Sequence, residues 1–145
     1  MRARGIPEIW YKGGTWETTN MGTKKPTEIR WLPEVDKHDY AAAESYLSLL
    51  YTDKAAGALV GQLRGARVRP FKAKDIFRAS RLPLLGAGNS HVEKDSTKIR
   101  KGGGLSPILL VRDRPNGKVE IADGYHRLCA VYLFDEDTPI QCKIV

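Results

Sequence analysis

The chain has 145 residues, of which 41% are hydrophobic and 28% charged, and its formal net charge is +7 at pH 7. It contains no run of 18 apolar residues, which excludes a transmembrane helix, and no apolar stretch follows Arg2 and Arg4 to make a secretory signal. Two cysteines, Cys129 and Cys142, are too few for a disulfide scaffold or a four-ligand zinc site. We therefore expect a globular cytoplasmic protein without a membrane partner or a bound structural metal.

Residues 1–35 show no clear helical or alternating period, and they contain all three tryptophans, Trp10, Trp16 and Trp31. We predict an irregular, aromatic-rich arm, or else a short hairpin, that lays its aromatic side chains on the main body. The same mixture of aromatic and basic residues would also suit stacking on nucleobases.

Two helices are predicted next, over residues 37–51 and 54–64, because their apolar residues recur at helical spacing. Asp36 or Asp39 could cap the first helix, and Asp53 could cap the second. Residues 36–66 therefore form a helical hairpin that precedes the main domain. Such a hairpin could bind a protein partner or a second copy of the chain.

A basic stretch follows, with seven basic residues and one acid, Asp75, between positions 64 and 81. A patch of this kind attracts phosphates, either of nucleic acid or of a nucleotide. The other interpretation is a solvated surface. The candidate nucleic-acid patch comprises Arg64, Arg67, Arg69, Lys72 and Arg78.

From residue 67 to residue 145 strands and helices are mixed. Strands are predicted at 68–71, 108–111, 118–122 and 139–145, and helices at 73–80, 91–101 and 125–134. Asn116-Gly117 between two apolar runs is a strong hairpin signal. The fold class is therefore α+β: a small mixed β-sheet with helices on one side, preceded by the helical hairpin.

The residues with the clearest chemistry lie where the strand ending near Ala122 meets the helix starting near Tyr125. A helix N-terminus offers unpaired N–H groups and the positive end of the helix dipole, so it is suited to anions. Gly124 lets the backbone approach a ligand, whereas His126 and Arg127 add donors in the first turn. Asp123 could take part in proton transfer or simply cap the helix.

The segment 123–130, Asp-Gly-Tyr-His-Arg-Leu-Cys-Ala, resembles the "DGxHRxxA" turn of ParB-like nucleotide-binding domains in the ParB/sulfiredoxin superfamily. Residues 105–111, Leu-Ser-Pro-Ile-Leu-Leu-Val, look like the "G-L-x-x-P-I-x-V" strand of that superfamily, and residues 138–140 look like its closing strand. The resemblance covers residues 67–145. It implies a ParB/sulfiredoxin-like domain there.

Two departures from the superfamily pattern limit the activities that the resemblance implies. Tyr125 occupies the position of the cysteine that sulfiredoxins use as nucleophile, so sulfiredoxin chemistry is not expected. No helix-turn-helix follows within the sequence, so a complete partition protein is not expected either. The turn is most similar to that of archaeal free-serine kinases and small ParB-like proteins.

In that branch the resemblance implies phosphoryl transfer or nucleotide hydrolysis with ATP, ADP or CTP and Mg²⁺. It implies Glu93 as the catalytic base, with Asp95 as the second choice, beside Asp123 and His126. Phosphate or nucleotide binding would involve Gly124, Tyr125, His126 and Arg127, together with His91, Lys94 and Lys98. The alternatives are a DNA-binding or nuclease accessory protein of plasmid or phage type, and a toxin–antitoxin-type interaction module.

Overall fold

The structure is a computed structural model that describes residues 8–12, 15–19 and 28–145. In the arm, β1 (Glu8–Lys12) and β2 (Thr15–Thr19) form an antiparallel pair in which Tyr11 lies opposite Trp16. Of the two arrangements expected for residues 1–35, this described part takes the hairpin form. The rest of the predicted arm up to residue 27 lies outside the described residues.

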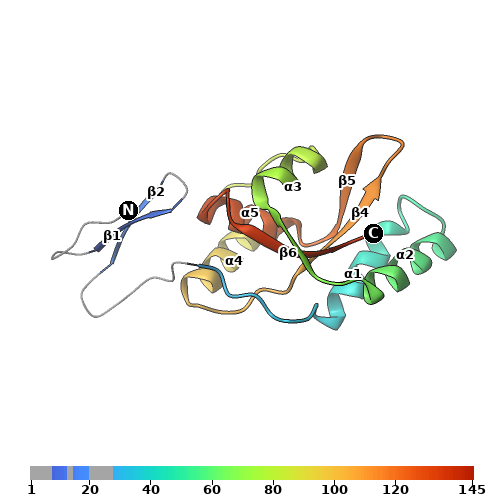
Figure 1. Cartoon of the computed structure of the whole chain (residues 1–145), viewed down its shortest axis with the longest axis horizontal. Coiled ribbons are helices and arrows are strands. Elements are labelled where there is room, and N and C mark those ends of the chain that lie inside the picture. Colours follow the sequence, from blue (N-terminus) through green and yellow to red (C-terminus); the bar gives the residue numbers. More distant parts are fainter. Residues whose placement is uncertain (1–7, 13–14, 20–27) are drawn as a thin grey trace.

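The main sheet has four strands: β3 (Arg69–Lys72), β4 (Ile108–Asp113), β5 (Lys118–Asp123) and β6 (Pro139–Ile144). Their order is β3-β6-β4-β5, with β4 parallel to β6 and the other two pairs antiparallel. Figure 1 shows this sheet among the helices of the chain, with the C-terminus at the end of β6. The prediction of an α+β chain with a small mixed sheet is confirmed.

The turn between β4 and β5 is the one predicted at Asn116-Gly117. Gly117 has φ 64°, a left-handed conformation that glycine adopts at little cost. The Asn116 side chain donates to Asp113 Oδ2 at 2.8 Å, and Arg81 donates to the Asn116 and Gly117 carbonyls at 3.3 Å each. Arg81 is the residue that ends α3 (Ala73–Ser80), so the C-terminal end of that helix is tied to this turn.

Three helices cover one face of the sheet: α3 (Ala73–Ser80), α4 (Ser90–Arg100) and α5 (Tyr125–Phe134). α5 connects β5 to β6, so it forms the crossover that brings β6 alongside β4 in parallel. The core on this face is apolar and includes Ile76, Val92, Ile99, Ile108, Leu110, Leu128, Val131 and Ile140. This layer holds α4 beside α5.

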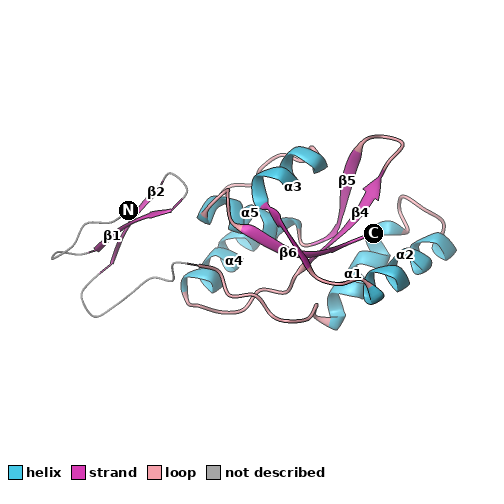
Figure 2. Cartoon of the chain, in the orientation of Figure 1, coloured by secondary structure: helices cyan, strands magenta, loops and turns pink. Residues whose placement is uncertain are grey.

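The helical hairpin α1 (Lys37–Leu47) and α2 (Asp53–Gly65) covers the opposite face of the sheet (Figure 2). Its core contains Tyr40, Ala43, Leu47, Ala56, Val60 and Leu63, packed with Leu109, Val111 and Ala122 of the sheet. The three helices α3, α4 and α5 lie on one side of the sheet as expected, and the hairpin, whose position the sequence left open, covers the other side. Four consecutive buried residues in β4 point alternately to both faces, so each face needs a cover.

Both hairpin helices begin at side-chain caps. The Asp36 carboxylate accepts from the His38 N–H at 2.9 Å, and Thr52, rather than the expected Asp53, accepts from the Ala55 N–H at 3.1 Å. α1 ends at Leu47 rather than at residue 51, because the following residues turn toward α2 with Leu49 80% exposed.

In the part of the chain that the structure describes, no helix is long and apolar enough to cross a membrane.

Candidate functional site

The turn between β5 and α5 requires a glycine. Gly124 has φ 114°, where a side chain is strained, and it forms the N-cap position of α5. A Cβ atom on Gly124 would lie 2.7 Å from Ile108 Cβ and 3.0 Å from Arg127 Nη2. The sequence indicates close approach to a ligand as the reason for this glycine. The structure adds a second reason, which is the close packing of the turn on β4.

No side chain caps the N-terminus of α5, since its N-cap residue is Gly124. The first intrahelical bond runs from the Leu128 N–H to the Gly124 carbonyl at 2.9 Å. The N–H groups of the first turn carry the positive end of the helix dipole. This terminus can therefore attract an anion.

One face of α4 lies opposite this terminus. His91, Lys94, Asp95 and Lys98 are spaced at three to four residues, which places them on the same side of the helix. Together with the β5–α5 turn they enclose a pocket of about 230 Å³. The pocket is lined by His91, Lys94, Asp95, Lys98, Asp123, Gly124, Tyr125, His126 and Arg127.

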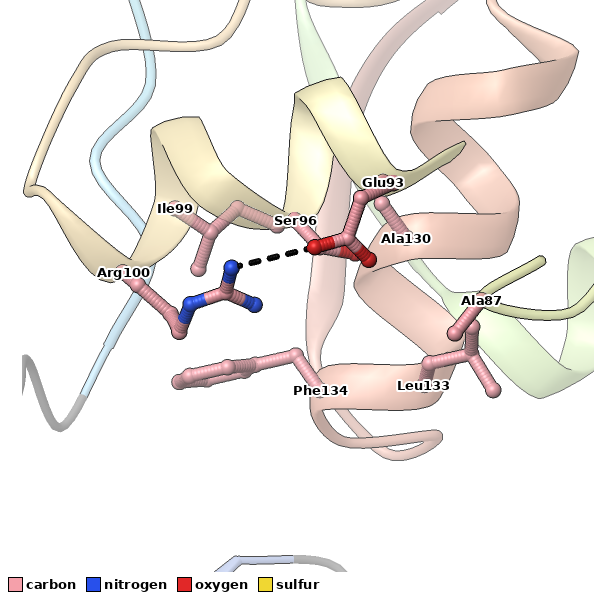
Figure 3. Close-up of a pocket in the computed structure, with 8 residues that line it drawn as sticks. All are labelled: Ala87, Glu93, Ser96, Ile99, Arg100, Ala130, Leu133 and Phe134. Carbon is pink, nitrogen blue, oxygen red and sulfur yellow. Dashed lines mark hydrogen bonds and ion pairs between the residues drawn. The ribbon is translucent and has the colours of Figure 1, made fainter. Parts of the chain in front are cut away.

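Glu93, the expected base, does not line this pocket. It lines a separate pocket of about 300 Å³ and pairs with Arg100 at 3.3 Å on the same helix. Figure 3 shows this pair above Phe134 and Leu133 of α5. Two positions after His91, Glu93 is on another face of α4, whereas Asp95, four positions after it, shares the His91 face. The carboxylate that α4 brings to the turn is therefore Asp95.

Arg127 lines the pocket but is not a free donor. Its Nη2 donates to Asp123 Oδ2 at 2.9 Å and lies 3.3 Å from Asp39 Oδ2 of α1. Ser106 Oγ donates to the same Asp39 oxygen at 2.7 Å. The Arg127 side chain is 17% exposed, and its buried Nε has no partner among the described residues. Arg127, which was expected to bind a phosphate, is thus engaged in an internal network that also holds α1.

Burial changes the acid–base properties of both pocket carboxyls. Burial raises the pKa of Asp123 above its ordinary value, Arg127 lowers it, and the neighbouring Asp39 raises it further. Burial likewise raises the pKa of Asp95, and the nearby charges of Arg127 and Lys98 oppose that rise. Carboxyls with raised pKa values are better proton acceptors when ionised.

Two histidines from different helices meet at the pocket. The rings of His91 and His126 lie 4.8 Å apart, and the ring of Tyr125 lies 5.8 Å from that of His126. The Tyr125 hydroxyl donates to the carbonyl of Pro83, which fixes the loop before α4 on this turn. The structure thus brings His91 of α4 and His126 of α5 together at one pocket.

Both cysteines are buried and free. Burial raises the pKa of Cys129, and it raises the pKa of Cys142 to about 12. Thiols of this kind are poor nucleophiles at neutral pH.

The residues of the candidate nucleic-acid patch are spread over neighbouring elements. Arg64 is at the end of α2 with its guanidinium 4.5 Å from the Tyr40 ring centre, and Arg69 is on the edge strand β3, 5.0 Å from the Phe71 ring centre. All five members are exposed, and none forms an ion pair with another described residue. Surface cations of this kind remain available to phosphates.

Asp39 and Ser106 are neighbours of the site that the sequence does not reveal. The sequence indicates Asp39 only as a helix cap, and 88 positions separate it from Arg127. No spacing rule connects them, because the contact exists only when α1 docks on the sheet. Helical spacing alone, by contrast, is enough to prefer Asp95 to Glu93.

Within residues 28–145 and the two described strands of the arm, no group of three His, Cys, Asp or Glu side chains could hold a metal ion. No protein-family model, curated protein or solved structure matches the chain.

Proposed function

We propose that the chain binds a nucleotide through its phosphates in the pocket between α4 and the N-terminus of α5, and that it catalyses phosphoryl transfer or nucleotide hydrolysis there. The observation that carries the proposal is the convergence of an uncapped helix N-terminus with the cationic face of α4. Lys94 and Lys98 form no ion pair with a described residue, so their charges can neutralise phosphate oxygens. The resemblance of residues 67–145 to ParB/sulfiredoxin domains is a second argument in favour of this proposal.

Phosphoryl transfer depends mainly on positioning and charge neutralisation. In the proposed reaction Lys94, Lys98 and the α5 amides hold the phosphates, and His126 donates from the side. Asp95 replaces Glu93 as the base that takes the proton of an acceptor hydroxyl or of water. A Mg²⁺ ion would bind chiefly to the nucleotide's own phosphates with help from Asp95, because magnesium sites at phosphates use only one or two carboxylates. The ion would neutralise charge on the phosphates.

The test is calorimetric titration of the protein with ATP, ADP, CTP and inorganic pyrophosphate, each with and without Mg²⁺. We expect at least one of these ligands to bind, and the double variant K94A/K98A to bind it at least about tenfold more weakly, as expected when charge-assisted hydrogen bonds are removed. Hydrolysis would be followed as release of inorganic phosphate, with D95N expected to lower the rate while binding persists.

The matched control is R100A/K101A, which removes two positive charges from the C-terminal end of α4 outside the pocket lining. It should bind the ligand as the unmodified protein does. Equal losses in both double variants would show a general charge effect, and the absence of binding by all four ligands would refute the proposed function.

Nucleic-acid binding is the second candidate, and the exposed cations on α2, β3 and α3 favour it. Arg69 and Lys72 lie on β3, the outer strand of the sheet, where a phosphate backbone can approach without displacing another strand. Arg64 and Arg67 continue the charge along the chain before β3. This surface does not share a residue with the pocket, so the two candidates can be tested separately.

A further inference from the structure

We infer that Asp39, on the N-terminal helix α1, competes with a bound phosphate for Arg127 and so limits the affinity of the anion pocket. The inference rests on the proposed function and adds a specificity-determining residue to the same site. Asp39 acts through Arg127 rather than by touching the ligand, because Asp39 is not among the residues that line the pocket.

The geometry shows one guanidinium nitrogen serving two carboxylates. Arg127 Nη2 lies 2.9 Å from Asp123 Oδ2 and 3.3 Å from Asp39 Oδ2, so the contact with Asp39 is the longer and weaker of the two. All three side chains are largely buried, with exposed fractions of 16% to 19%. Solvent therefore screens the charges in this network less than it would at the surface.

The charges around the pocket explain why Asp39 opposes an anion. Lys94, Lys98 and Arg127 bring three positive charges to the lining, and Asp95 and Asp123 bring two carboxylates. Asp39 supplies a third carboxylate to Arg127 from outside the lining and balances the remaining cation. A phosphate that enters the pocket adds further negative charge near these carboxylates. Like charges repel, so the carboxylates oppose its binding.

The network can release Arg127 from Asp39 without leaving that carboxylate unpaired. Ser106 Oγ donates to Asp39 Oδ2 at 2.7 Å, and the Asp36 N–H donates to Ser106 Oγ at 3.0 Å. Asp39 therefore keeps a hydrogen-bond donor from the loop before β4 when Arg127 turns to a ligand. Arg127 can then offer its Nη groups to the ligand while it retains Asp123.

The opposite role is a positioning contact, in which Asp39 holds Arg127 in the orientation that phosphate needs. The two roles predict opposite changes in the affinity for an anion when the charge of Asp39 is removed. Removing the charge of Asp39 strengthens anion binding if Asp39 competes, and weakens it if Asp39 only positions Arg127.

The experiment compares inorganic pyrophosphate binding by the full chain, D39N and D39E by calorimetry, with thermal unfolding of each variant as a check on folding. D39N keeps the shape and an acceptor for Ser106 but removes the charge, whereas D39E keeps the charge. We expect D39N to bind pyrophosphate at least about threefold more tightly than the unmodified protein, because an ion pair even at the surface contributes up to about 1 kcal/mol. D39E should bind with nearly the unmodified affinity.

Each outcome decides the inference. Tighter binding by D39N alone supports it, including the case in which only D39N binds measurably. Unchanged or weaker binding by D39N overturns it but leaves the proposed function intact when the unmodified protein binds. If neither protein binds pyrophosphate, the inference falls, and the nucleotide titrations decide whether the proposed function falls with it. If D39N does not fold, the test uses S106A, which removes the hydrogen bond from Ser106 and leaves Arg127 as the main partner of Asp39. S106A must then bind pyrophosphate more weakly than the unmodified protein does, or the inference fails.

Discussion

Gly124 is the residue on which the strand-to-helix turn depends. Its φ of 114° and the closeness of Ile108 leave no room for a side chain, although the same residue also opens the α5 N-terminus to a ligand. The glycine therefore has a structural reason that does not depend on function. The effect of replacing it must be separated from any effect on binding.

The variant G124A should destabilise the fold by roughly 1–3 kcal/mol, the cost of a side chain forced into a sparsely populated backbone conformation. Urea unfolding followed by circular dichroism would measure this. The matched control is G61A in the middle of α2, where a Cβ atom would meet nothing within 4 Å among the described residues and should stabilise the helix by about 0.5–1 kcal/mol. Equal stability of G124A and the unmodified protein would contradict the geometry of the turn.

The raised pKa of Asp95 leads us to predict how the free energy of unfolding depends on pH. Burial, the largest cause, favours the protonated carboxyl in the folded chain, while Arg127 and Lys98 oppose it. The stability that this group contributes is full below its ordinary pKa of about 3.9 and is lost as the pH rises through the raised pKa. D95N cannot titrate, so its free energy of unfolding relative to the unmodified protein should increase over that window.

Asp137 provides a control of opposite sign, because a hydrogen bond from Lys74 lowers its pKa. The stability it contributes is present above the ordinary carboxyl pKa and is lost as the pH falls through the lowered value. The free energy of unfolding of D137N relative to the unmodified protein should therefore decrease as the pH rises. Unfolding curves at several pH values below 7 would measure both variants, and the same pH trend in both would contradict the assignment.

At the scale of elements, the central strand β4 decides how the helices are arranged. Ile108 and Leu110 face one core, whereas Leu109 and Val111 face the other. The α1–α2 hairpin therefore shares a core with the sheet and covers its second face. This placement brings α1 to Arg127.

Truncating a buried side chain of the hairpin should weaken the whole fold. Leu47 is 0% exposed, so L47A should cost about 2–5 kcal/mol, as large-to-small core substitutions do. L49A is the matched control, because Leu49 is 80% exposed and its truncation should change stability little. Urea unfolding should show one transition for L47A, shifted to lower urea. Separate unfolding of the hairpin, with the sheet unaffected, would show that the two do not form one cooperative core.

At the scale of the whole molecule, positive charge is the dominant property, with a net charge of +7. The pocket and the basic patch are two separate places where this charge could meet phosphate. Their salt dependence differs, because a nucleic acid releases condensed counterions when it binds, whereas one nucleotide releases few.

If the patch binds DNA, the affinity should fall steeply between 50 and 200 mM salt, a range over which roughly 10³-fold decreases are typical of several phosphate contacts. The triple variant R67A/R69A/R78A should flatten the slope of log affinity against log salt by about one for each arginine that binds a phosphate. The control K37A/K54A/K101A removes the same charge elsewhere and should keep the slope. Fluorescence anisotropy with a labelled duplex would measure it, and binding that does not respond to salt would exclude the patch.

The sequence by itself determined the unit formed by β4, β5 and α5. Asn116-Gly117 specifies a tight turn, the apolar run 108–111 specifies a buried strand, and the glycine at 124 permits the turn into α5, so local chemistry was enough. The helix limits of α5 were predicted as observed for the same reason. The residues of the β5–α5 turn followed from these elements, whereas His91, Lys94 and Lys98 of α4 were expected only from the resemblance to ParB/sulfiredoxin domains.

Only the tertiary structure decided what surrounds that unit. The face of the sheet on which the hairpin lies depends on burying both sides of β4, and no local pattern in residues 36–66 states it. The contact of Asp39 with Arg127 follows from that docking, as does the pairing of Arg127 with carboxylates instead of solvent. Contacts between residues far apart in the chain arise only when separate apolar faces come together. The burial of apolar surface that drives this step has no preferred direction, so no local pattern specifies which distant residues will meet.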